Sequence, residues 1–156
     1  MSMSINSPAF NNNQAIPDQF TCAGSDISPA LHWTNIPPAA KSLVLIVDDP
    51  DAPDPAAPKM TWVHWVLYNL PPECEGLGEA ILPGALPEGT MQGLNDWKRT
   101  GYGGPCPPIG RHRYFFKLYA LDTVLTDLKK ATKAQVETAM QGHVVESAQL
   151  VGTFEK

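Results

Sequence analysis

Three stretches of the chain hold side chains that can do chemistry. The first is an acidic turn with Asp49 and Asp51, the second a strand-like segment around His64, and the third a glycine- and proline-rich run that ends in His112 and Tyr114. Histidine and aspartate exchange protons near neutral pH, and a protonated histidine attracts anions. Glycine lets the backbone approach a ligand, and with proline it can aim amide N–H groups at an anion. These residue types indicate an anion-binding or acid–base site.

Each stretch also has a purely structural interpretation. The acidic turn can be a solvated loop, His64 a buried core histidine, and the glycine–proline run an ordinary turn. Cys106 is the one candidate nucleophile near these residues, and its proline neighbours favour a turn residue. The sequence has no nucleophile elbow, P-loop or metal-ligand spacing. We therefore expect a binding module without cofactor or metal, with a hydrolase or a scaffold with a vestigial pocket as alternatives.

These residues lie beside segments that are predicted to be strands. Residues 43–47 form an apolar run typical of a strand buried on both faces, so a strand is predicted at 43–48, and Pro50 and Pro53 are expected to end it. Residues 61–70 and 113–121 are rich in aromatic and β-branched side chains. Because His112 and Tyr114 alternate, they are expected to share one face. Shorter strands are predicted at 31–34, near 90–92 and at 150–155, so the fold should be mainly β.

A change of hydrophobic period near the carboxy terminus predicts a helix. Thr132 and Gln135 form a capping box, so the helix should begin near residue 133. Val136, Met140 and Val144 follow at helical spacing, and Gly142 is expected to break the helix into two pieces. Residues 71–112 are expected to hold little regular structure, and an irregular segment of this length is often functional.

The composition limits what the protein binds. The chain has 156 residues, with 11 basic and 16 acidic side chains and a formal charge of −5. One domain, residues 1–156, with its own core is expected at this length. An acidic protein does not hold nucleic acid or an anionic membrane through its overall field. No apolar run reaches the ~20 residues that span a bilayer. We therefore expect no nucleic-acid partner and no integral membrane segment.

The cysteines and the amino terminus bear on location. Cys22, Cys74 and Cys106 are widely spaced and contain no Cys-x-x-Cys pair. This spacing argues against a disulfide framework and against a cysteine zinc site, so three free thiols are expected. The first residues lack the basic and apolar regions of a signal peptide. A cytoplasmic location follows as an expectation.

Taken together, the motifs resemble the phosphatidylethanolamine-binding protein family. The matching stretches are Asp49-Pro50-Asp51-Ala52-Pro53, Trp62-x-His64-Trp65, Gly104-Pro105-Cys106-Pro107-Pro108 and His112-Arg113-Tyr114, supported by Ser28-Pro29-x-Leu31-x-Trp33 and Gly93-Leu94-Asn95-Asp96-Trp97. The resemblance covers nearly the whole chain. Within the family, the chain looks like the short bacterial branch that is often labelled Raf-kinase-inhibitor-like.

The resemblance implies an antiparallel β-sandwich with short helices near the carboxy terminus. It also implies a small pocket that binds phosphate-like anions and phosphorylated head groups, in a regulatory or inhibitor-like module. Carried over residue by residue, the ligand-binding residues would be Asp49, Asp51, Trp62, His64, Gly104, Pro105, Cys106, Pro107, Pro108, His112 and Tyr114. A homodimer is implied as well, and a binding module of this kind can also take an unidentified protein partner. Cys106 in place of a glycine and the missing carboxy-terminal segment of animal members argue against kinase inhibition and membrane-lipid binding.

Two carboxylates next to an anion need compensation. Like unit charges ~4 Å apart cost about 4 kcal/mol at an effective dielectric constant near 20. We expect protonated His64 and His112 to offset this repulsion, with one aspartate orienting a histidine. Backbone N–H groups and the Tyr114 hydroxyl would then contact the anion. An amine on the ligand would pair with the remaining carboxylate.

Overall fold

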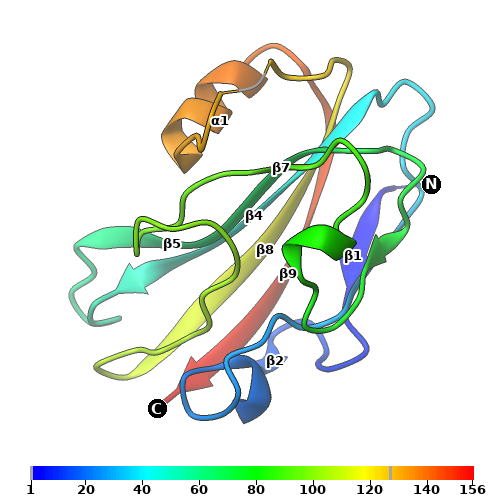
Figure 1. Ribbon diagram of the computed structural model, residues 1–156. Helices are drawn as coiled ribbons and strands as arrows, with labels where there is room; N and C mark the ends of the chain where they lie inside the picture. Colours follow the sequence, from blue (N-terminus) through cyan, green and yellow to red (C-terminus); the bar gives the residue numbers. More distant parts are fainter. Residues whose placement is uncertain (1, 127) are drawn as a thin grey trace.

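Two β-sheets and one α-helix make up the regular structure of the described residues, 2–126 and 128–156 of the computed structural model (Figure 1). The larger sheet has the strand order β2-β9-β8-β4-β5-β7, the smaller one β1-β3-β6. Among these strands only the β2–β9 pair is parallel. The strands are β1 (Ser4–Asn6), β2 (Gln14–Ala15), β3 (Leu31–Thr34), β4 (Ser42–Ala52), β5 (Met60–Leu70), β6 (Gly76–Leu77), β7 (Met91–Gln92), β8 (Arg111–Leu121) and β9 (Val144–Glu155), and the helix is α1 (Lys133–Met140). Residues 71–112 hold β6, β7, a short 3-10 turn and the first two residues of β8, so the prediction of little regular structure in this segment is confirmed.

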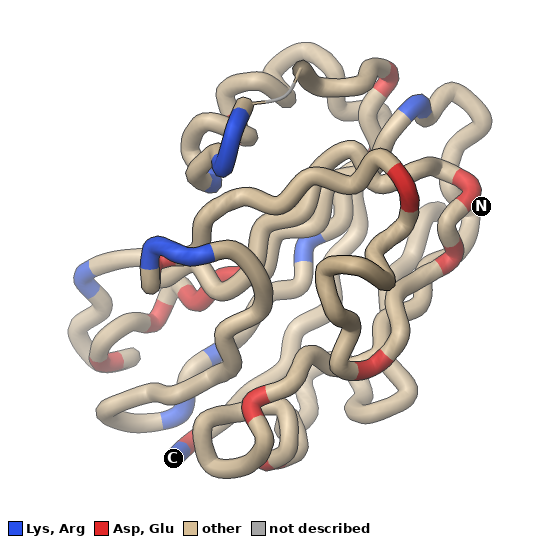
Figure 2. The backbone as a smooth tube through the Cα atoms, viewed as in Figure 1, with Lys and Arg blue, Asp and Glu red and all other residues tan. Residues whose placement is uncertain are grey.

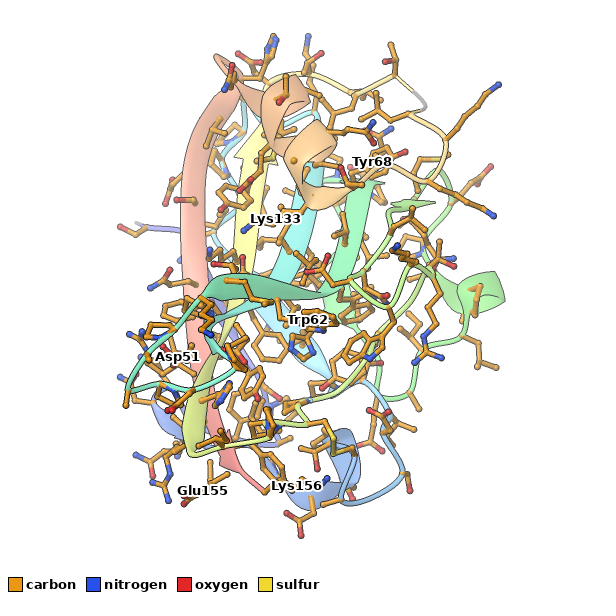
Figure 3. All side chains as sticks on the ribbon, turned by 90° about the vertical axis from the view of Figure 1, so that its left-hand side faces the viewer. Asp51, Trp62, Tyr68, Lys133, Glu155 and Lys156 are labelled. Carbon is orange, nitrogen blue, oxygen red and sulfur yellow. A yellow bond between two sulfur atoms is a disulfide. The ribbon has the colours of Figure 1, made fainter. Side chains whose placement is uncertain are left out.

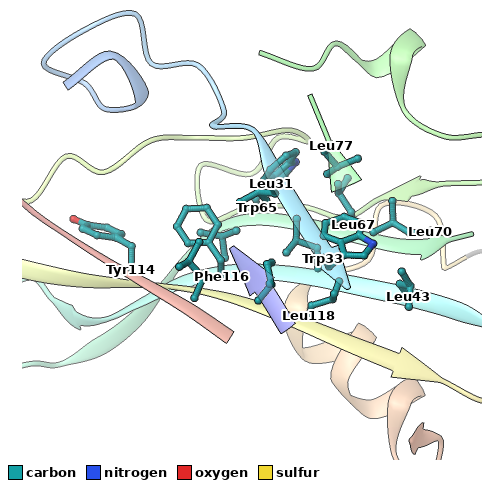
Figure 4. Packing of buried hydrophobic residues seen from close by; sticks show 14 of the residues in the cluster. Leu31, Trp33, Leu43, Trp65, Leu67, Leu70, Leu77, Tyr114, Phe116 and Leu118 are labelled. Atoms are coloured by element: carbon teal, nitrogen blue, oxygen red, sulfur yellow. The ribbon is translucent and has the colours of Figure 1, made fainter. Parts of the chain in front are cut away.

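The two sheets pack face to face around an apolar core (Figure 4). The smaller sheet contributes Leu31 and Trp33, and the larger sheet contributes Leu43, Leu67 and Leu118. Alternate residues of each strand point into this layer because successive side chains of a strand face opposite sides. The predicted antiparallel β-sandwich with a helix near the carboxy terminus is therefore confirmed.

Strand β4 is buried on both faces, as its unbroken apolar run predicts. Leu43, Leu45 and Val47 pack between the two sheets. Val44 and Ile46 pack on the opposite face, in a second apolar cluster that includes residues of α1. This central position makes β4 a rigid support for the acidic residues that follow it.

β4 ends at Ala52, directly before Pro53, as predicted for that proline, whereas the predicted end at Pro50 is wrong. Proline has no N–H to give to a neighbouring strand, so it needs a place where no bond is required. Pairing of β4 with β8 ends at Asp48 and Phe115, and its register with β5 is irregular between Asp49 and Ala52. Pro50 lies in that irregular stretch and costs the sheet no hydrogen bond.

Helix α1 begins at the predicted capping box. The Thr132 hydroxyl accepts a hydrogen bond from the Gln135 amide, and the Gln135 side chain accepts one from the Thr132 amide. The predicted second helical piece after Gly142 is wrong, because Val144 begins β9, which pairs with β8 along its whole length. The Val144 side chain is 45% exposed, so its helical spacing did not mark a buried face. Among the described residues, no helix is long and apolar enough to cross a bilayer.

A buried carboxylate joins α1 to the large sheet. Asp48 lies on the helix-facing side of β4 and is 1% exposed. The Lys117 ammonium of β8 lies 3.1 Å from its Oδ2, and that of Lys133, the first residue of α1, lies 2.8 Å away (Figure 3). The helix is thus fixed by charge as well as by its apolar face.

Candidate functional site

Most of the side chains predicted for the site meet in one pocket, near the point where β4 ends and β5 begins; Figure 3 labels Asp51 and Trp62 in this region. The pocket has a volume of about 380 Å³, within the ~300–1,000 Å³ range of small-molecule sites. Its lining residues are Asp49, Ala52, Pro53, Met60, Trp62, His64, Trp97, Cys106, Pro107, Pro108, His112 and Tyr114. Strands β8, β4 and β5 are neighbours in the sheet, which brings these distant stretches of sequence together.

His112 and Asp49 form a buried ion pair in the wall of the pocket. The Nδ1 atom of His112 lies 2.5 Å from Oδ2 of Asp49, and their side chains are 1% and 4% exposed. The other nitrogen, Nε2, faces the backbone carbonyls of Ile109 at 2.9 Å and Pro53 at 3.1 Å. Carboxylate and carbonyl oxygens only accept hydrogen bonds, so both ring nitrogens must carry a proton. His112 is therefore an imidazolium whose charge is compensated by Asp49.

This arrangement removes most of the expected repulsion between Asp49 and an anion. The second oxygen of Asp49, Oδ1, accepts a hydrogen bond from the Asp51 amide at 2.7 Å. Both oxygens of Asp49 are thus occupied, and the pair with His112 carries no net charge. The expectation that one aspartate orients a histidine agrees with this geometry. His112, however, has no N–H left for a ligand.

His64 reaches the pocket because of a β-bulge. Val47 pairs with Trp65 and Asp48 pairs with Val63, so one residue of β5, His64, has no partner in β4. A bulge of this kind redirects a side chain. The ring lies edge-on to Tyr114 with 5.2 Å between ring centroids, and its Nδ1 lies 2.7 Å from the Gly103 carbonyl.

Burial, not the nearby carboxylates, decides the charge of His64. Loss of solvation lowers the pKa of the His64 imidazole below its ordinary value, against the opposing effects of the Gly103 carbonyl and of Asp49. The expectation of a protonated His64 is therefore wrong for the ligand-free protein at neutral pH. The neutral ring donates through Nδ1 to Gly103. Its Nε2 is the lone-pair nitrogen and makes no hydrogen bond with a described residue.

Tyr114 supplies a hydroxyl to the same pocket. Its ring is 1% exposed and stacks on His112 with 6.3 Å between centroids and 17° between planes. Burial, together with the charge of Asp49, raises the pKa of the Tyr114 hydroxyl, so the group keeps its proton. Within the described part of the chain the hydroxyl has no hydrogen-bond partner, although it lines the pocket. It is available as a donor.

The rest of the wall is apolar and aromatic. Trp62 and Trp97 meet edge to face, with 5.6 Å between ring centroids, and Met60 lies at the rim with 48% exposure. Sequence reasoning missed Trp97, Met60, Ala52 and Pro53 as lining residues. Trp97 belongs to the supporting motif at residues 93–97, so the motif could have been used to predict that Trp97 lines the pocket.

Positive charge lies beside this apolar rim, despite the net charge of −5. The guanidinium of Arg99 lies 5.9 Å from the centre of the Trp97 ring. Figure 2 shows basic residues on the loop that follows β7 and on the loop that precedes β5.

Three predicted residues lie outside the pocket lining and brace the wall instead. Both carboxylate oxygens of Asp51 bind the Arg113 guanidinium, at 2.9 and 2.8 Å, and this contact lowers the pKa of Asp51. The Gly104 amide donates to Oδ1 of Asp26 at 2.7 Å, and the Pro105 carbonyl accepts from the Cys22 amide at 3.1 Å.

The glycine amides of this run do not point at the pocket as expected. The Gly103 amide donates to the His64 carbonyl at 3.0 Å, and the Gly104 amide is taken by Asp26. A Cβ at residue 104 would lie 2.4 Å from the Phe20 carbonyl oxygen, so only glycine fits there. The run is held by its contacts with other loops, and the donors for a ligand must come from side chains.

The expectation of three free thiols is wrong. Cys22 and Cys106 form a disulfide, with 5.3 Å between their Cα atoms, and Cys74 alone is free. The two bonded cysteines are 84 residues apart, so their spacing carried no signal of the bridge. Since the Cys106 sulfur is bonded, it is not a nucleophile in this form. Among the described residues, no group of His, Cys, Asp or Glu side chains could hold a metal ion.

Comparisons with known proteins agree with this fold and pocket. Residues 6–155 match the model of the phosphatidylethanolamine-binding protein family. A UPF0098 protein of Methanothermobacter thermautotrophicus is 50% identical over 155 residues, which cover 99% of both chains.

Two solved structures are also close. A phosphatidylethanolamine-binding protein homolog from Chlamydia trachomatis superposes with a TM-score of 0.91 at 44% identity, covering 99% of this chain and 98% of that one. YbcL of Escherichia coli, described as a new member of the mammalian family, gives a TM-score of 0.88 at 28% identity and covers 100% of this chain and 99% of its own. The chain belongs to the phosphatidylethanolamine-binding protein family.

Proposed function

We propose that the pocket binds small phosphate-like anions or phosphorylated head groups, and that the protein is a regulatory binding module. One observation carries this proposal. His64 and Tyr114 are 3% and 1% exposed as whole residues, but Nε2 of His64 and the hydroxyl of Tyr114 make no hydrogen bond with a described residue and are not among the buried polar atoms without a partner, so both are open to the pocket that they line. Polar groups held in place at the wall of an otherwise mostly apolar pocket, and not used by the protein itself, are what fixes the orientation of a small ligand.

The two groups suit an anion in different ways. The Tyr114 hydroxyl donates at any pH near neutrality, because burial raises its pKa. The Nε2 atom of His64 donates only after the ring takes up a proton, which a bound anion favours. His112 supports the site indirectly, since its imidazolium is held by Asp49 and its ring stacks on Tyr114.

The aromatic wall suits the organic part of such a ligand. Trp62 and Trp97 offer apolar surface beside the anion-binding groups, and a tryptophan face attracts an ammonium group. The expected pairing of a ligand amine with Asp51 is not supported, because both oxygens of that carboxylate bind Arg113. Phosphoethanolamine, with its phosphate and its ammonium, is therefore a suitable probe.

Calorimetric titration with phosphoethanolamine and inorganic phosphate tests the proposal. Charge-assisted hydrogen bonds contribute about 1.5–3 kcal/mol, so His64→Ala should weaken binding by about ten- to a hundredfold. Asp49→Asn should also weaken it, because asparagine has one acceptor oxygen where Asp49 uses two, for His112 and for the Asp51 amide. His143→Ala serves as the control, since His143 lies outside the pocket on an exposed turn.

The outcomes separate the candidate functions. Binding without turnover supports the module. Release of inorganic phosphate from phosphoethanolamine, lost in His64→Ala, would favour the hydrolase alternative. If neither compound binds to the wild-type protein, or if Asp49→Asn binds more tightly, the proposed pocket chemistry is incorrect.

A further inference from the structure

The wall of the pocket formed by residues 106–108 is joined to a distant loop by one disulfide bond. Cys106 lines the pocket, and its sulfur is bonded to that of Cys22 in the loop after Phe20. Both cysteines are exposed to solvent. The disulfide is therefore a part of the binding site that a reagent in solution can reach.

The wall next to this bond has no other polar attachment. Residues 106–108 make no hydrogen bond with any part of the chain that the structure describes, and Pro107 and Pro108 have no N–H to give. The nearest bonds lie on either side of them. The Pro105 carbonyl accepts from the Cys22 amide, and the Ile109 carbonyl lies 2.9 Å from Nε2 of His112. Between these points, apart from packing, only the disulfide holds the wall in place.

We infer that the Cys22–Cys106 bond is a redox control of ligand binding, which rests on the proposed function of the pocket. In the oxidised protein the bond holds residues 106–108 against the cavity. In the reduced protein these residues are free to move away from Trp62 and Tyr114, and the pocket is complete for only part of the time. Apparent affinity falls in proportion to the fraction of molecules in the competent state.

The chemical step is thiol–disulfide exchange with an external dithiol. A thiolate of the dithiol attacks one sulfur of the bridge, forms a mixed disulfide and releases the other cysteine as a thiolate. The second thiol of the reagent then displaces the remaining cysteine. Two electrons and two protons pass to the protein, which gains two thiols, while the dithiol becomes a disulfide. Exposure of both cysteines allows the first attack.

Reduction should leave the rest of the site intact. The Gly104 amide still donates to Asp26 at 2.7 Å, and the Tyr102 hydroxyl still donates to the Phe20 carbonyl at 2.7 Å. Gly103, whose carbonyl contacts His64, lies before residues 106–108 in the chain, so this contact should also remain. The effect is therefore on the wall and not on the fold, which is what a reversible control requires.

The experiment compares three proteins in oxidised and dithiothreitol-reduced form: the wild type, Cys22→Ser and Cys74→Ser. Phosphoethanolamine affinity is measured by calorimetry, and hydrogen exchange of the segment 103–112 by mass spectrometry. We expect reduction to weaken wild-type binding by about tenfold, as for a wall that is closed about a tenth of the time. Cys22→Ser should bind weakly in both conditions, because it keeps Cys106 but lacks the bridge. Cys74→Ser should respond as the wild type does, since Cys74 lies outside the pocket.

Hydrogen exchange keeps this inference separate from the proposed function. If the oxidised wild type fails to bind phosphoethanolamine, the proposed function fails, while faster exchange of residues 103–112 on reduction still supports the control of the wall. Equal affinity and equal exchange in the oxidised and reduced wild type would overturn the inference. So would three free thiols in the purified, unreduced protein.

Discussion

At the scale of single residues, the pocket is defined by how two histidines hold their protons. His112 is fixed as an imidazolium, because Asp49 and two carbonyl groups accept from both of its nitrogens. His64 is neutral, because burial lowers its pKa. His112 thus has a structural role, whereas His64 can take up a proton when an anion binds. The two residues look alike in the sequence. The difference arises from partners that sequence patterns do not reveal.

Because His64 can take up a proton when an anion binds, we predict that anion binding depends on pH. A bound dianion stabilises the protonated ring of His64, so binding raises a pKa that burial has lowered. Affinity should therefore be highest below the pKa of the free protein and fall as the pH rises through it. It should become constant above the pKa of the complex. The change should reach about tenfold for each unit by which binding raises the pKa.

Sulfate is the suitable probe for this dependence, because its own charge does not change across the range. Titrations at about pH 5.5 and about pH 8 bracket the ordinary range of histidine. In His64→Gln the slope should disappear, while other contacts are kept. A sulfate affinity in the wild type that is constant, or that rises with pH, would contradict the role assigned to His64.

At the scale of elements, the alternation of β4 sends its acidic residues to opposite faces. Asp49 faces the pocket, whereas Asp48 faces α1 and lies between Lys117 and Lys133. Removing one partner of a buried ion pair costs about 3–5 kcal/mol when the other charge stays buried. Both lysines are partly exposed, at 27% and 18%, so part of that cost is relieved by water.

Asp48→Ala should therefore lower the free energy of unfolding by about 2–3 kcal/mol, somewhat less than for a fully buried pair. Urea denaturation at neutral pH measures this change. Glu137→Gln is the matched control, because Glu137 meets Lys133 at 3.9 Å with 44% exposure and should change stability by less than about 0.5 kcal/mol. A loss for Asp48→Ala as small as that of the control would show that Asp48 does not anchor the helix.

An element could be predicted from the sequence where the residues that stabilise it are neighbours in the chain. The apolar run of residues 43–47 and the run of aromatic and β-branched residues at 61–70 determine their own strands, because most of their side chains are buried. Val144 had helical spacing but belongs to β9, since pairing with β8 outweighs a local pattern of weakly buried residues. The Cys22–Cys106 bridge joins two loops that meet only after the sheets are packed. No local signal could have shown it.

At the scale of the whole molecule, the site exists because of strand order. Asp49, His64 and Tyr114 come from β4, β5 and β8, which lie next to one another in the large sheet. The residue types and motifs of the site could be predicted from the sequence, and so could the shared face of His112 and Tyr114. Strand order, the bulge at His64 and the ion pair of Asp51 with Arg113 could not. They depend on long-range pairing that a single sequence does not encode locally.

The last prediction is that the chain forms a homodimer through the end of the sheet that lies away from the pocket. β8 begins at the pocket with His112 and ends at Leu121, which pairs with Val144. Three valines near this far end, Val124, Val144 and Val145, are 59%, 45% and 43% exposed, which favours an interface there.

A stable interface buries about 1,200–2,000 Å² in total, or roughly 600–1,000 Å² on each partner. That is about a tenth of the 7750 Å² surface of one chain. Light scattering should give twice the 16.9 kDa mass of the chain. Val145→Glu should shift the protein toward monomer, because it places a charge in the interface. Leu82→Glu, at a 71% exposed position elsewhere, should leave the dimer intact.

A monomer mass at every concentration of the wild type would exclude the dimer. A dimer that survives Val145→Glu and is lost in Leu82→Glu would place the interface on the loop between β6 and β7.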